Sequence, residues 1–204
     1  MRALLTAALL LVAVAAHTDG YVDTLSILAG SSAAPENETL VPESTVTSTN
    51  NSCTTSTAHG TVDEDVDSPG TDRCTATTCG GSGTTQGLWE FDFPSPTGNL
   101  TGNQVFRTIV RQCTTGGTAS TCTIEVVDGD GVECSSGAQA VSNSGSDLEL
   151  SYTWTLASCT GINGIAASGA AVRLRITCPS SGGSPSSRRT ADLNTVNWDA
   201  TYQP

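Results

Sequence analysis

A strictly alternating run near the middle of the sequence, LWEFDF at 88–93, constrains the fold most. Trp89, Phe91 and Phe93 occupy every second position and so share one face of an extended chain. The opposite face carries Glu90 and Asp92, which suit a side that meets solvent. The run therefore predicts a half-buried β-strand whose aromatic face packs into a hydrophobic core.

Further alternating runs follow at regular spacing, with turn-forming residues between them. That spacing is typical of an antiparallel β-sandwich. The 21 glycines and the low charged fraction, 14%, also favour a turn-rich β-protein. We therefore predict an all-β, jelly-roll-like antiparallel sandwich of about seven strands, with all three Trp side chains in its core. The expected strands are 88–93, 105–112, 122–128, a short one near Val132, 148–155, 172–178 and 195–202.

Three segments are predicted along the chain: an apolar N-terminal helix or signal-like segment at 1–16, an extended Thr/Ser-rich arm with an acidic loop at 17–87, and the β-sandwich domain at 88–204. The first segment fits a secretory signal peptide. It equally fits a retained helix that packs in an assembly, and the sequence leaves both open. Its candidate assembly residues are the large apolar ones: Leu4, Leu5, Leu9, Leu10, Leu11 and Val12.

Eight cysteines favour disulfides formed outside a reducing cytoplasm. A metal site is the weaker alternative, because no histidine lies near the cysteine pairs. We predict a Cys113–Cys122 bond across the base of a hairpin, and a staple of a Gly/Thr-rich loop by Cys74 and Cys79. Two further pairings are guesses: Cys134 with Cys159, and Cys53 with either cysteine of that loop. The sequence does not settle the connectivity.

Candidate sites for chemistry are few. The acidic stretch 61–72 alternates Asp63, Asp65 and Asp67 as a calcium loop does, but it lacks the required Gly and Glu positions, so a solvated loop is the simpler interpretation. Glu90 and Asp92 could act as a pair of glycosidase carboxylates, although outward carboxylates on a sheet are usually just solvated. We expect no catalytic residues, no cofactor and no metal site.

Charged residues limit the partners and suggest structural roles. The net charge of −12 argues against nucleic-acid binding. Arg107 and Arg111 are expected to pair with Asp or Glu on a neighbouring strand. Three N-glycosylation sequons begin at Asn37, Asn50 and Asn99, a weak signal in a Thr-rich chain.

Residues 43–202 resemble a β-sandwich domain that recurs in virion proteins of tailed viruses (bacteriophages). The resemblance is carried by AHGTVDEDVDSPGTD at 58–72, WEFDFPSPTGNLTGNQVFRTIVR at 89–111 and RRTADLNTVNWDATY at 188–202, with shorter matches PESTVTSTN, LELSYTW and VRLRIT. It implies a non-enzymatic structural protein of a virion surface, as a capsid decoration, spike or tail component. Its implied partners are other virion proteins and copies of itself, with host-surface glycans as a further possibility and no membrane in the mature form.

The cysteines and the signal-like N-terminus depart from that family and keep a second function class open. This alternative is a secreted, extracellular carbohydrate-binding β-sandwich module. It requires Trp89, Trp154 or Trp198 to face solvent, against their assignment to the core.

Overall fold

The computed structural model of the chain describes residues 33–49, 51–53, 57–76, 87–96, 98–113, 119–127, 131–159, 161–162, 172–179 and 191–204. The chain divides into residues 1–34 and 35–204, and the fold described here is that of the second unit. The predicted segment 1–16 and its assembly residues lie outside the described residues. None of the helices in the described ranges has the length and apolar character needed to span a bilayer.

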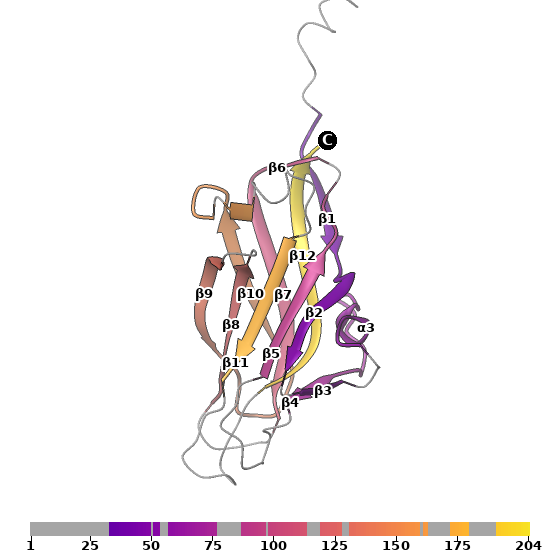
Figure 1. Cartoon of the computed structure of the whole chain (residues 1–204), viewed down its shortest axis with the longest axis vertical. Coiled ribbons are helices and arrows are strands. Elements are labelled where there is room, and N and C mark those ends of the chain that lie inside the picture. Colours follow the sequence, from indigo (N-terminus) through magenta and orange to yellow (C-terminus); the bar gives the residue numbers. More distant parts are fainter. Residues whose placement is uncertain are drawn as a thin grey trace, which may run out of the picture. The chain divides into compact units, whose positions relative to one another are not determined.

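Two antiparallel sheets form a sandwich (Figure 1). The first sheet has the order β10-β7-β12-β4-β3, and β1 and β6 also pair with β12. The second sheet has the order β2-β5-β11-β8-β9. The first sheet consists of β1 (Glu36–Leu40), β3 (Asn51–Cys53), β4 (Cys74–Ala76), β6 (Asn99–Leu100), β7 (Asn103–Gln112), β10 (Leu148–Thr155) and β12 (Ala191–Gln203). The second consists of β2 (Ser44–Thr49), β5 (Gly87–Phe93), β8 (Thr121–Val127), β9 (Val132–Ala140) and β11 (Val172–Cys178).

The chain crosses repeatedly between the two sheets. It passes from β7 in the first sheet to β8 in the second, from β9 back to β10, then to β11, and finally to β12. This alternation lets each strand bury its apolar face against the opposite sheet. The predicted all-β antiparallel sandwich is confirmed. Strands beyond the expected seven arise mostly before residue 88.

Those early strands correct the interpretation of residues 17–87 as an extended arm. Within the described part, β1 pairs along β12 and β2 pairs along β5, so both belong to the sandwich. Both strands lie at the margin of their sheets and need few apolar side chains. In β1 only Leu40 is buried. A strand of that kind has no alternating apolar pattern for the sequence to reveal.

The core is aromatic, as predicted for the three Trp residues. Trp89, Trp154 and Trp198 are buried, together with the three Phe side chains. The ring of Phe106 stacks on that of Trp198 with centroids 5.4 Å apart, and it meets Trp154 edge-on at 4.6 Å. Phe93, from the second sheet, packs edge-on against Phe106 at 6.1 Å and so joins the two layers.

Three disulfides lie within the described residues: Cys53–Cys74, Cys122–Cys178 and Cys134–Cys159. Cys113 is also disulfide-bonded, and Cys79 lies outside the described residues. The predicted Cys113–Cys122 bond is wrong, because β7 and β8 belong to different sheets and do not form a hairpin. The Cys74–Cys79 staple is wrong too, since Cys74 lies opposite Cys53 in the β3–β4 pair. Of the two guesses, Cys134 does bond Cys159, and Cys53 takes Cys74.

Candidate functional site

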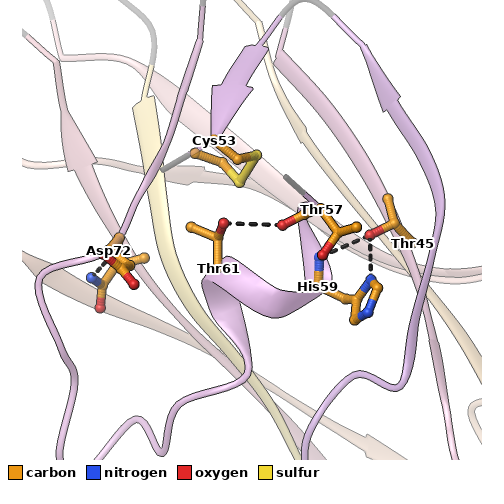
Figure 2. Close-up of a disulfide and its surroundings, with 8 residues drawn as sticks. Thr45, Cys53, Thr57, His59, Thr61 and Asp72 are labelled. Carbon is orange, nitrogen blue, oxygen red and sulfur yellow. Dashed lines mark hydrogen bonds between the residues drawn. A yellow bond between two sulfur atoms is a disulfide. The ribbon is translucent and has the colours of Figure 1, made fainter. Parts of the chain in front are cut away.

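The Cys53–Cys74 disulfide closes a covalent loop around the acidic stretch of the sequence. The bonded cysteines are 21 positions apart, and residues 57–73, called here the closed loop, lie between them. The loop contains a short helix, α3 (His59–Val62), next to the disulfide (Figure 2). The closed loop contains no strand and folds back over the first sheet, which sets it apart from the rest of the described surface.

Two buried amides of β12 hold the closed loop against the first sheet. Asn197 accepts a hydrogen bond from the Val66 N–H at 2.5 Å and donates one to the Glu64 carbonyl at 3.1 Å. Asn194 donates to the carbonyls of Gly70 and Asp72, at 3.1 and 2.7 Å. These bonds satisfy loop backbone groups that would otherwise lose water without replacement. The loop therefore covers the outer face of β12, whose residues 191–198 are all buried.

The helix α3 also ties the closed loop to the second sheet. The backbone N–H of His59 donates to Thr45 Oγ1 in β2 at 2.8 Å, and His59 Nδ1 lies 2.9 Å from the same hydroxyl (Figure 2). Thr61 Oγ1 donates to the Thr57 carbonyl at 3.0 Å. His59 is thus half-buried and engaged in holding α3 in place. This position suits a structural histidine more than a catalytic one.

Arg107 of β7 is the charged anchor of the loop. Its Nε lies 2.7 Å from Asp199 Oδ2 in β12, and its Nη1 lies 2.8 Å from Asp67 Oδ1 in the loop. Burial alone would lower the pKa of Arg107, but its hydrogen bonds and attraction to Asp67 and Asp199 outweigh that effect and raise the pKa. The guanidinium remains charged at any accessible pH. Arg111 pairs with Asp192 of β12 at 3.2 Å, so both predicted Arg–carboxylate pairs are confirmed.

Two of the loop carboxylates accept hydrogen bonds from the backbone of the loop itself. Asp65 Oδ1 accepts the Asp67 N–H at 2.9 Å, and Glu64 Oε2 accepts the Gly70 N–H. Asp63, Asp65 and Asp67 are exposed. Across the described ranges, no three His, Cys, Asp or Glu side chains lie together in a way that could hold a metal ion. The geometry supports a solvated, internally bonded loop and gives the calcium interpretation no further support.

The outer face of the second sheet is a ladder of ion pairs. Arg173 Nε lies 3.0 Å from Asp92 Oδ1, and Arg175 Nη2 lies 2.5 Å from Glu90 Oε1. Arg175 also approaches Glu125 of β8 at 3.8 Å. These are directly opposed residues on β5, β11 and β8. Each carboxylate of the suggested glycosidase pair faces a guanidinium, an arrangement that favours a structural role over proton transfer.

The described aromatic side chains offer little exposed ring surface on which a sugar could stack. All three Trp side chains are at most 1% exposed. Among the aromatic residues that the structure describes, Tyr152 of β10 is the one that is not buried. Its ring centroid lies 4.3 Å from that of Trp154. The condition set for a carbohydrate-binding module, a solvent-facing Trp, is not met.

Replacing Asn197 by Ala is expected to free the closed loop. The substitution leaves the Val66 N–H and the Glu64 carbonyl without their buried partner, at a cost of about 2–3 kcal/mol in the free energy of unfolding. Hydrogen exchange at the Val66 amide should accelerate, and protease should cut within 63–72 sooner. Asn103→Ala, at an exposed asparagine that begins β7, is the matched control. Equal exchange rates in both variants would show that Asn197 does not hold the loop.

Comparisons with known proteins leave the family open. No protein-family model matches the chain, and no curated protein matches it. The C-terminal CBM6 of LamC, a marine laminarinase from Zobellia galactanivorans, is 11% identical with a TM-score of 0.41, covering 80% of this chain and 99% of that one. Arthrobacter globiformis T6 isomalto-dextranase complexed with panose is 17% identical with a TM-score of 0.39, covering 64% and 19%.

A viral structure is similar to the same degree. The structure of infectious bursal disease virus, Gt strain, is 11% identical with a TM-score of 0.36, and the match covers 83% of this chain and 32% of that one. At identities and TM-scores this low, we draw neither fold nor function from these similarities.

Proposed function

We propose that this chain is a non-enzymatic structural protein of a virion surface, a capsid decoration, spike or tail component, that assembles into symmetric copies through its N-terminal segment. The observation that carries the proposal is that the charged side chains that could take part in chemistry are instead engaged in ion pairs within the fold. All five Arg residues in the described ranges form ion pairs: Arg73, Arg107, Arg111, Arg173 and Arg175. Side chains engaged in this way stabilise a scaffold and leave little for catalysis.

The disulfides support a setting outside the reducing cytoplasm. Three are present among the described residues, and bonds of this kind persist on secreted proteins and virion surfaces. The net charge of −12 suits exposure to solvent and disfavours contact with nucleic acid. Large apolar side chains are rarely exposed on the described surface; Val41, Val46 and Val132 are the examples. Assembly through the apolar residues of segment 1–16 is consistent with that polar surface.

Assembly of the full-length chain tests the proposal. Light scattering should find an oligomer, and Leu9→Ser, Leu10→Ser and Leu11→Ser together should shift the protein towards monomer. The matched control is Val41→Ser with Val46→Ser, which replaces exposed apolar residues of the sandwich and should leave the oligomer intact. Mass spectrometry of purified particles should find the protein with its N-terminus retained. A monomeric chain that is absent from particles would refute the proposal.

Tyr152 is the one observation in favour of a second candidate, the secreted carbohydrate-binding module. Its part-exposed ring, backed by Trp154, could stack on a sugar. This candidate predicts saturable binding on a glycan array that Tyr152→Ala removes and Tyr152→Phe retains. Absence of sugar binding by the disulfide-bonded protein would exclude it.

A further inference from the structure

Two of the three sequons lie within the described residues. Asn37-Glu38-Thr39 is in β1, and Asn99-Leu100-Thr101 begins at β6. Both asparagine side chains are exposed. The third sequon begins at Asn50, which lies outside the described residues, and it is left out of this inference.

The fold brings these two sequons to the same end of the first sheet. Asn37 is paired with Thr201, and Asn99 is paired with Gln203. The two asparagines therefore lie on strands that flank the last residues of β12. In Figure 1, β1 and β6 lie near the marked C-terminal end of β12. Positions 62 residues apart in the sequence thus share one end of the sandwich, where attached groups would extend into solvent.

The local hydrogen bonds are compatible with a glycan on each asparagine. Asn37 uses its Oδ1 to accept a bond from Thr201 Oγ1 at 2.8 Å, whereas an N-linked sugar is attached through Nδ2 and retains that oxygen. Thr39 Oγ1 donates a hydrogen bond to Asp199 Oδ1 at 2.8 Å in the folded chain. A transferase that needs this hydroxyl would therefore have to act before β1 pairs with β12.

Asn99 begins the short strand β6, and its side chain is exposed. Gly98 approaches the backbone so closely that a Cβ there would lie 2.2 Å from the Gln203 carbonyl oxygen, which excludes a side chain at that position. Gly102 has a φ of 62°, a left-handed conformation that favours glycine. Between these two constrained positions the exposed Asn99 is held at the surface, the usual setting of a modified sequon.

We propose that Asn37 and Asn99 are N-glycosylation sites and that this end of the sandwich is covered by sugar. In the transfer, the Nδ2–C1 bond forms and the bond from C1 to the phosphate of a lipid-pyrophosphate-linked oligosaccharide breaks. The amide loses one proton, and the lipid pyrophosphate is the leaving group. The inference rests on the proposed function only in requiring export through an oxidising secretory compartment. Subunit contacts in an assembly would then use other faces of the sandwich.

The test uses the full chain behind an added secretion signal, expressed in insect cells. Glycopeptide mapping with and without peptide N-glycosidase should find both asparagines modified and converted to Asp by the enzyme. Asn37→Gln and Asn99→Gln should each lose one glycan mass, and Asn103→Gln, an exposed asparagine outside any sequon, should lose none. Thr39→Ser and Thr101→Ser keep the sequons and should keep the glycans, which separates sequon loss from misfolding.

Disulfide mapping of the same samples separates the two proposals. If the Cys53–Cys74 and Cys122–Cys178 bonds are formed but Asn37 or Asn99 is unmodified, the glycan assignment for that residue is overturned. Export through an oxidising compartment is not contradicted by that result. Modified asparagines on a protein that never enters particles support the glycan sites and count against the virion role.

Discussion

Replacing Trp198 by Ala is expected to lower the free energy of unfolding by about 4–5 kcal/mol, the upper end of the range for a buried aromatic side chain. The indole is fully buried in the middle of β12 and stacks on Phe106 at 5.4 Å. Its Nε1 donates to Gln104 Oε1 at 3.1 Å, so the substitution also weakens a buried polar contact. Cavity formation and the lost hydrogen bond act together, and a loss of this size is a large part of a typical domain's stability.

Urea unfolding followed by circular dichroism measures this effect. Trp198→Phe keeps most of the ring volume and removes the indole N–H, so it should cost only about 1–2 kcal/mol. Val132→Ala, at an exposed position in β9, should change stability by less than about 0.5 kcal/mol. If Trp198→Ala costs no more than Val132→Ala, the indole does not lie in the core and the assignment of β12 is wrong.

The sequence predicts the strands that bury one face against the other sheet. Trp89, Phe91 and Phe93 alternate because they meet the core, and Leu174 and Ile176 of β11 do the same. Burial of these side chains stabilises the fold and also explains why apolar residues occupy every second position of the strands. The strands β1 and β2 lack that alternation. They lie at the margin of their sheets, consist largely of Thr, Ser, Asn and Glu, and are held by backbone pairing with β12 and β5.

The candidate site was less accessible to prediction than the fold. Asn194 and Asn197 are polar residues of β12 and so suggest contact with solvent, yet both are buried because the closed loop covers them. The carbonyl bound by Asn197 lies 133 positions away in the sequence, at Glu64. A run of alternating residues shows which face of a strand is polar but not which distant segment supplies its partners.

Cysteine pairing depends on the same long-range information. Cys122 and Cys178 are 56 positions apart and become neighbours only because β8 pairs directly with β11. The short spacing from Cys113 to Cys122 favours a hairpin, but the crossing between sheets places the two cysteines on strands that do not pair. Loop length alone therefore selects the wrong partner.

Removing the Cys122–Cys178 bond is expected to lower the free energy of unfolding by about 4 kcal/mol, the cost predicted for releasing a loop of that length in the unfolded chain. Both cysteines are buried at the end of the β8–β11 pair. The variant should therefore be Cys122→Ala with Cys178→Ala, because Ser would bury hydroxyls in an apolar site. The denaturant m-value should rise as well, since the unfolded chain can expand further without the bond.

The matched comparison is Cys53→Ala with Cys74→Ala, which opens the closed loop. Its bond spans only 21 positions, so the same chain-entropy relation gives a smaller loss, about 3 kcal/mol. The two variants should also differ locally: opening the closed loop exposes residues 57–73 to protease at low denaturant, whereas loss of Cys122–Cys178 weakens the sandwich as a whole. A greater loss for the Cys53–Cys74 variant would contradict the chain-entropy account and show that the disulfide acts mainly by holding the closed loop on β12.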